Sequence, residues 1–395
     1  MTSLNTWRVH RALTLVGTTA LTLALTACGG GGGGDGGSTG GTGSTTTGTT
    51  GQSLLDAYTV PAAVAAEKTE NFPTAFNASN TYLQSNCQVA GNASTTVYVG
   101  PNTLVYATTG VSDKAQALAA DYSEQSIAAI KTYFGLDTSV VGFDGTKIQV
   151  CVDSSLGASA GDDSTGVSGQ GAFRALDVMS VDAPSFAARY PGATSLNAPV
   201  GTSYFDLYRH EMTHVYEETT VGSVATGSIE RWFNEAVAVT VSQLPMPDKA
   251  TVLGYAQQDL ITANSQAAVD MNVYPVYGAA IQMIMSSALG GLGNGVGSIN
   301  TFLTTYRANA IAACALAIPN GVTEPAYLTD GMPAGTYNGC YVTSGASSTA
   351  LQPVFDATFR QVFKDTGGGP LLLHTSDGAN SLEATLASRL AAYLP

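Results

Sequence analysis

Five consecutive residues, His210-Glu211-Met212-Thr213-His214, have the types and spacing of a metal site. Two imidazoles one helical turn apart project from the same face of a helix, so they can bind one Zn²⁺, and the glutamate between them can hold a water molecule on the metal. The chain has only 4 histidines, so a chance match to all three fixed positions is rare, on the order of 10⁻³ to 10⁻² per chain. The alternative interpretation is two ordinary histidines on a helix surface.

A catalytic zinc needs a third protein ligand and one open position. The next predicted helix contains Trp232-Phe233-Asn234-Glu235-Ala236, and the intervening residues suffice for a loop and an antiparallel return helix. Glu235 is therefore the expected third ligand. The alternative interpretation of Glu235 is an exposed helix carboxylate.

With these residues the chain resembles the gluzincin zinc metallopeptidases, the clan of thermolysin and the zinc aminopeptidases. There HExxH is completed by a glutamate about twenty residues further on, within N-E-A or W-x-N-E-G. The resemblance implies a zincin-type catalytic domain, Zn²⁺ on His210, His214 and Glu235, and Glu211 as general base. The metzincin continuation would need glycine and histidine where this chain has Glu217 and Thr220.

A hydrogen-bond donor for the developing oxyanion is expected beside the metal. The segment from Tyr274 to Ala280 resembles the aminopeptidase segment Y-x-K-G-A, which begins with the catalytic tyrosine. In that register Tyr277 stands where the family has glycine. Tyr274 is the preferred donor, Tyr277 is the alternative, and His374 is a weaker candidate.

Gluzincins also present an edge strand to which substrate adds as an antiparallel strand. The residues from Gln170 to Arg174 loosely resemble it, but Phe173-Arg174 replaces the acidic residue with which aminopeptidases hold a free amine in G-A-M-E-N. This departure from the aminopeptidase pattern favours internal cleavage of a peptide or protein substrate over removal of terminal residues.

The N-terminus predicts export. Arg8 and Arg11 precede an apolar stretch from Ala12 to Ala27, and Leu25-Thr26-Ala27-Cys28 resembles the lipobox of bacterial lipoproteins. The resemblance implies cleavage before Cys28 and a lipid anchor on it, in the cell envelope, on the periplasmic or surface side of the outer membrane. A single-pass anchor is the competing interpretation. The net charge of −14 argues against nucleic-acid binding, because no basic face is offered to phosphates.

The cysteines agree with an oxidising compartment. Assigning Cys28 to the lipid leaves four of the 5 cysteines for two disulfides. Three pairings are possible, and Cys87–Cys151 with Cys314–Cys340 is the one we expect.

Hydrophobic periodicity predicts strands and one helix first, and then helices only, which is an α+β pattern. We expect a small N-terminal sheet with an edge strand, packed on a mainly helical zincin-type domain. Strands are predicted at 95–107, with a turn at Gly100-Pro101, at 147–152 and at 172–181, with a polar loop over 157–171. Helices are predicted at 113–134, 203–219, 229–243, 248–262, 274–289, 298–308, 351–364 and 382–393.

The expected domains are a lipoprotein signal peptide (1–27), a Gly/Thr/Ser-rich tether (28–52), a gluzincin-like domain (53–300) and a helical C-terminal region (301–395). The hypothesis is a zinc-dependent peptide-bond hydrolase, most simply an endopeptidase, tethered to the envelope. The alternative is a catalytically silent zinc-binding lipoprotein with a role in assembly or adhesion.

Overall fold

The computed structural model describes residues 50–77, 85–89, 91–156, 165–168, 175–190, 203–258, 261, 273–344 and 347–395. The expected signal peptide, Cys28 and the expected edge strand at 170–174 lie outside these residues. Helix α1 (Thr50–Ala57) begins inside the last residues of the expected tether. No helix in the described ranges is long and apolar enough to cross a membrane.

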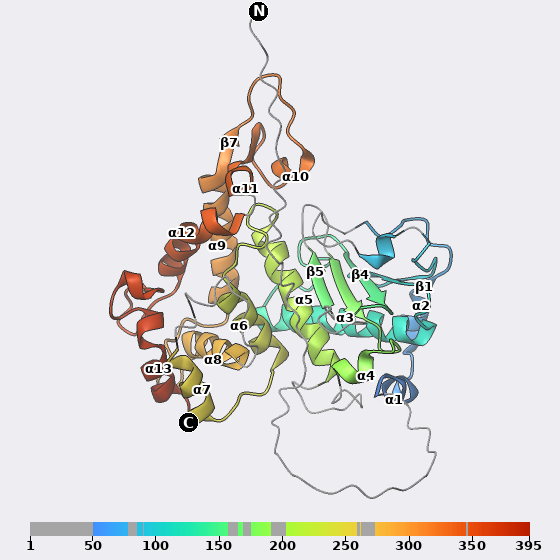
Figure 1. The fold of residues 1–395 in the computed structure, drawn as a ribbon, viewed down its shortest axis with the longest axis horizontal. Helices are drawn as coiled ribbons and strands as arrows, with labels where there is room; N and C mark the ends of the chain where they lie inside the picture. Colours follow the sequence, from blue (N-terminus) through green and yellow to red (C-terminus); the bar gives the residue numbers. More distant parts are fainter. Residues whose placement is uncertain are drawn as a thin grey trace, which may run out of the picture.

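The first half of the chain forms a mixed 6-stranded sheet with the order β1-β2-β3-β4-β6-β5 (Figure 1). The central strands β3, β4 and β6 are parallel, and the flanking pairs are antiparallel. The strands are β1 (Lys68–Thr69), β2 (Val97–Val99), β3 (Thr103–Ala107), β4 (Ile148–Asp153), β5 (Thr165–Ser168) and β6 (Ala175–Met179). The predicted hairpin at 95–107 and the strand at 147–152 are confirmed.

Helix α3 (Asp113–Phe134) connects the parallel strands β3 and β4 and packs on the sheet. Its ends match the prediction because both caps are encoded locally: the Ser112 hydroxyl accepts a hydrogen bond from the Ala115 N–H, and Gly135 adopts the left-handed conformation with φ 64°. Successive side chains of β4 face opposite sides of the sheet, and both sides are largely buried. In β4, Val150 and Val152 belong to the main core, whereas Cys151 joins a smaller cluster on the other face.

The prediction of a structureless polar loop over 157–171 is wrong in part, because β5 lies within it. β5 pairs with β6 in antiparallel register, from Thr165 opposite Val178 to Ser168 opposite Ala175. The segment Thr-Gly-Val-Ser has too little hydrophobic alternation to indicate a strand by itself, so its conformation comes from pairing with β6.

The second half is helical. Short helical elements that were not predicted occur in both halves: α2 (Ala62–Ala66), η1 (Asn86–Gln88), α4 (Phe186–Arg189), α10 (Ala326–Thr329), α11 (Gly339–Ser344) and η3 (Thr375–Asp377). The main helices are α5 (Tyr204–Val221), α6 (Arg231–Ser242), α7 (Lys249–Ala256), α8 (Tyr274–Met285), α9 (Gly297–Cys314), α12 (Ser347–Val362) and α13 (Leu382–Tyr393). A mixed sheet followed by helices confirms the coarse α+β architecture.

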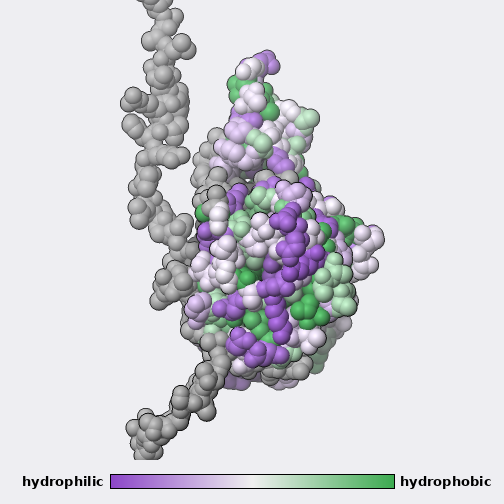
Figure 2. Space-filling view, turned by 90° about the vertical axis from the view of Figure 1, so that its right-hand side faces the viewer, coloured by the Kyte–Doolittle hydropathy of each residue, from purple (hydrophilic) through white to green (hydrophobic). Residues whose placement is uncertain are grey.

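A single buried cluster joins the two halves, running from Leu54 in α1 to Leu390 in α13. Helix α5 contacts α3 and β6 on one side and α6 and α9 on the other, so it lies between sheet and helices (Figure 1). Figure 2 shows the face on the side of β1 and α2, where hydrophilic residues form a stripe between separate hydrophobic patches.

Both expected disulfides are present. Cys87–Cys151 joins η1 to β4, with Cα atoms 5.9 Å apart, and Cys314–Cys340 has a Cα separation of 5.1 Å. The second disulfide lies at the base of an unpredicted hairpin of β7 (Ala315–Ala317) and β8 (Thr336–Asn338), which projects from the end of α9 (Figure 1).

Candidate metal centre

Helix α5 carries the HExxH residues, and its start is encoded by a capping box. The Ser203 hydroxyl accepts from the Asp206 N–H, and the Asp206 carboxylate accepts from the Ser203 N–H. Asp206 also pairs with Arg209, whose guanidinium donates to the Ser242 carbonyl at the end of α6. These contacts fix the helix end and tie α5 to α6.

The two histidines of the motif face each other on one side of α5. His210 and His214 are 0% and 6% exposed, and their Nε2 atoms lie 3.2 Å apart. Glu211, between them in sequence, is 2% exposed. The spacing of the motif thus brings both ring nitrogens to one point inside the protein.

Helix α6 returns along α5 and brings Glu235 to that point. Its Oε2 lies 3.3 Å from His210 Nε2 and 3.6 Å from His214 Nε2, and the residue is 1% exposed. On the opposite side of α6, the Phe233 ring packs on aromatic rings of α9 and α12, the closest being Phe302 at 4.6 Å. The buried aromatic face therefore orients the helix so that Glu235 points to the histidines.

The three atoms have the spacing of zinc ligands. A tetrahedral site with bonds of about 2.0–2.1 Å has ligand atoms about 3.3–3.4 Å apart. The observed separations are 3.2, 3.3 and 3.6 Å. Among the residues described, Glu235 Oε2 has no hydrogen-bond partner although it is fully buried, which suits a ligand atom. The residues present therefore fit a zinc ion.

The charges at this point are strongly coupled. Burial disfavours ionised Glu235, but the two imidazoles outweigh it and hold the pKa of this carboxyl at about 2. Burial likewise opposes a charged His214, and Glu235 and Glu217 together raise its pKa. Negative charge therefore persists on the Glu235 side of the site at neutral pH.

Glu217 is a site residue that sequence analysis missed. Its Oε2 lies 3.1 Å from His214 Nδ1, and the residue is 0% exposed. Metal-binding histidines commonly donate their second N–H to a carboxylate, which fixes the ring and its tautomer. The available signal was an acidic residue three positions after His214, on the same helical face.

Both candidate tyrosines lie on α8, which packs against α6. Gly278 permits the close approach, because a Cβ there would meet Val239 Cγ1 at 2.7 Å. Tyr274 is 3% exposed, and its hydroxyl has no hydrogen-bond partner within the described ranges. Burial and then the Glu235 carboxylate raise the pKa of Tyr274, which places its hydroxyl near that carboxylate. For Tyr277 the influence of Glu235 on the pKa ranks below that of Arg231.

The remaining predicted site residues fall elsewhere. His374 belongs to a separate cluster with Glu230 and Asp356, and Cys28 lies outside the described residues. The strand at the edge of the sheet beside α5 is β5, and the segment at 170–174, where we expected it, is outside the described ranges.

Comparison of the chain with known protein families and with curated proteins gives no match.

Proposed function

We propose that this protein is a zinc-dependent peptide-bond hydrolase that cleaves within peptide or protein chains and is held at the cell envelope by a lipid on Cys28. The carrying observation is the convergence of His210 Nε2, His214 Nε2 and Glu235 Oε2 with separations of 3.2–3.6 Å. The envelope location rests on the sequence of the first 28 residues alone.

His210, His214 and Glu235 would hold the zinc ion. When bound, zinc supplies Lewis acidity to the scissile carbonyl and to the attacking water. Glu211 takes the proton from that water and passes it to the leaving amine. Its position supports this role, because it is 2% exposed and its Oε1 has no hydrogen-bond partner among the described residues.

Tyr274 donates a hydrogen bond to the oxyanion that develops on the scissile carbonyl. The hydroxyl is buried near Glu235 and is not engaged by another described side chain or backbone group. A donor that is already oriented needs little reorganisation when charge develops. Tyr277 lies on the same helix, with its ring centroid 6.0 Å from that of Tyr274, and is the weaker candidate.

The sheet edge supports an extended substrate. β5 pairs with β6 on one side, and in the described ranges its other side has no strand partner. β5 also packs beside α5, the helix of the HExxH motif (Figure 1). A peptide added antiparallel to β5 gains backbone hydrogen bonds and passes next to the candidate metal centre.

The test is digestion of an unstructured protein by the purified full-length chain, with metal analysis of the same sample. We expect cleavage that stops with a chelator and returns with zinc. The Glu211→Gln variant should retain zinc and lose roughly 10²- to 10⁴-fold in turnover. Glu218→Gln is the matched control, because Glu218 is on the same helix and binds the Gly227 N–H.

Full activity of Glu211→Gln would refute the mechanism. Stoichiometric zinc without cleavage of any member of a peptide library would instead support the silent zinc-binding lipoprotein.

A further inference from the structure

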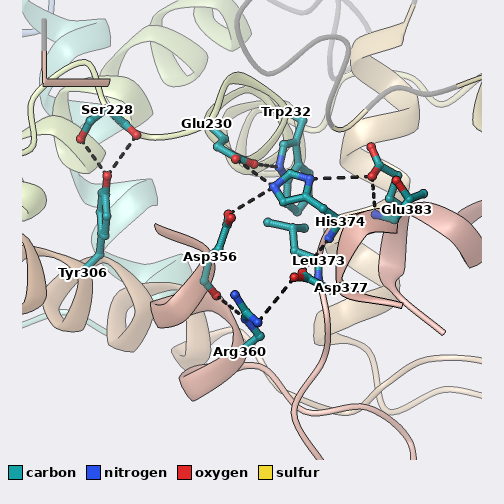
Figure 3. Close-up of polar contacts among 11 residues, drawn as sticks. Ser228, Glu230, Trp232, Tyr306, Asp356, Arg360, Leu373, His374, Asp377 and Glu383 are labelled. Atoms are coloured by element: carbon teal, nitrogen blue, oxygen red, sulfur yellow. Dashed lines mark hydrogen bonds and ion pairs between the residues drawn. The ribbon is translucent and has the colours of Figure 1, made fainter. Parts of the chain in front are cut away.

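A second group of ligand-type side chains lies at the start of α6. Glu230, which immediately precedes the helix, meets Asp356 of α12 and His374 of the segment before α13 (Figure 3). We call these three residues the His374 cluster. Their side chains are 4%, 18% and 8% exposed, respectively, so the group is largely buried.

The contacts in the His374 cluster are longer than those of the well-aligned Arg389–Asp365 ion pair. His374 Nε2 lies 3.2 Å from Glu230 Oε1 and 3.2 Å from Asp356 Oδ1. The Arg389–Asp365 pair, in contrast, has N–O distances of 2.7 and 2.8 Å. Charge-assisted hydrogen bonds are normally about 2.7–2.9 Å long, whereas ligand atoms around a zinc-sized ion are about 3.3–3.4 Å apart. The spacing in the cluster is closer to the second case.

The hydrogen-bond capacity of His374 also favours a bound cation. His374 Nε2 carries at most one hydrogen, yet it faces two carboxylate oxygens at equal distance. A single shared hydrogen cannot be well aligned to both oxygens. A divalent cation between the three atoms would satisfy the two carboxylates and the nitrogen lone pair together.

The surroundings resemble the outer layer of a metal site. His374 Nδ1 lies 3.8 Å from Glu383 Oε2, and that oxygen accepts a hydrogen bond from the Thr375 N–H (Figure 3). The second oxygen of Glu230 accepts from the Trp232 indole N–H at 2.7 Å, which leaves Oε1 directed at His374. The indole N–H thus holds the Glu230 carboxylate in place, as the groups around a metal site orient its ligands.

We propose that Glu230, Asp356 and His374 form a second binding site, for a divalent first-row transition metal cation. One imidazole and two carboxylates suit zinc or a similar cation better than calcium, which prefers oxygen ligands alone. Asp356 is the most exposed of the three, so solvent completes the coordination from its side. The proposal does not depend on peptidase activity.

The bound cation would fasten the C-terminal region to α6. Its ligands come from the residue before α6, from the middle of α12 and from the segment leading to α13. Glu230 caps the start of α6, five residues before Glu235 within the helix, so the two sites would be linked through one end of α6. The role is structural: it holds the start of α6 while Glu235 meets the histidines.

The experiment counts zinc. Full-length protein is stripped with a chelator, dialysed against zinc alone, and analysed for metal equivalents per chain. We expect His374→Gln to bind one equivalent less than the unmodified protein, and His210→Gln also to bind one less, from the other site. Asp377→Asn is the matched control, because Asp377 accepts from the His374 N–H in the same segment without belonging to the cluster. It should retain the full count.

The second measurement is thermal unfolding on the His210→Gln background, where only the proposed site can respond. Zinc should raise the midpoint by several degrees there, and should not do so once His374→Gln is added. Glu383→Gln should weaken zinc binding about 10-fold. Should His374→Gln fail to fold, Asp356→Asn replaces it, because Asp356 is the most exposed ligand.

Equal zinc counts in the unmodified protein and the His374 or Asp356 variant would overturn the proposal. So would a zinc-independent loss of stability in these variants, because that identifies a protonated His374 held by two carboxylates. Failure of the peptidase assay would leave the count at this site unchanged, so the two proposals can fail separately.

Discussion

His214 Nδ1 lies 3.1 Å from Glu217 Oε2, one turn further along α5, while Nε2 of the same ring faces His210 and Glu235. The ring is thus held from both sides by groups that are themselves buried. One helix supplies two candidate ligands, the candidate base between them and the carboxylate that orients the second ligand.

Glu217→Gln should weaken zinc binding about 10- to 100-fold while the protein stays folded. Glutamine still accepts a hydrogen bond from the ring, but its lack of charge makes the imidazole a poorer electron donor. The measurement is competition for zinc with a chelator of known affinity, with Glu218→Gln as control. An unchanged affinity for zinc in Glu217→Gln would show that the contact between Glu217 and His214 does not contribute to metal binding.

Tyr274→Phe should lower kcat about 10²- to 10³-fold and leave KM nearly unchanged, because in the proposed mechanism the hydroxyl stabilises the transition state. Stability should not fall, since the buried hydroxyl has no hydrogen-bond partner in the described part of the chain. Steady-state kinetics of Tyr274→Phe and Tyr277→Phe give the comparison. A larger loss in Tyr277→Phe would reassign the donor.

Asp177→Asn should stabilise the protein above neutral pH. Burial raises the pKa of the Asp177 carboxyl to about 7, although the Ser85 hydroxyl donates to it; Asp153 adds to the increase. In the unfolded chain an aspartate ionises near pH 4, so between about pH 4 and 7 the folded state keeps a proton that the unfolded state releases. Its contribution to the free energy of unfolding therefore decreases as the pH rises through this window.

The asparagine variant does not lose stability in this way. At pH 8 its free energy of unfolding should therefore be a few kcal/mol larger than that of the unmodified protein, since each pKa unit is worth about 1.4 kcal/mol. At pH 4 the two should be similar. Urea unfolding at pH 4, 6 and 8 measures the difference, and an identical pH slope in both proteins would contradict the assignment to Asp177.

The two disulfides should contribute different amounts to the free energy of unfolding. They close loops with sequence separations of 64 and 26 residues. Loop-closure entropy then predicts losses of about 4 kcal/mol for the Cys87→Ser, Cys151→Ser double variant and about 3.5 kcal/mol for Cys314→Ser, Cys340→Ser. Unfolding in denaturant checks both values. The first pair joins η1 to a central strand of the sheet, so a smaller cost there than in the hairpin pair would contradict the prediction.

Local signals predicted the elements whose ends are encoded beside them. Helices α3 and α13 begin after serine caps, and their observed bounds match those expected from periodicity. The HExxH motif and Asn234-Glu235-Ala236 likewise led to three side chains that the structure brings together.

Contacts between distant segments could not be predicted in this way. β5 exists because β6 is beside it, and its four residues carry little strand signal. The His374 cluster joins residues that lie far apart along the chain, and neither their types nor their spacing in sequence predicts that they meet. Glu217, in contrast, could have been predicted, because it lies three positions after His214 on the same face of the helix.

If the proposed peptidase function holds, the edge position of β5 has a consequence for the choice of substrate. A chain that pairs with this strand must present several consecutive residues in extended form with free backbone groups. Helices and paired strands of a folded protein do not offer these, so the rate of cleavage would follow how often a target opens locally rather than how well its surface fits. Selectivity would then reside in the stability of the target and not only in its side chains.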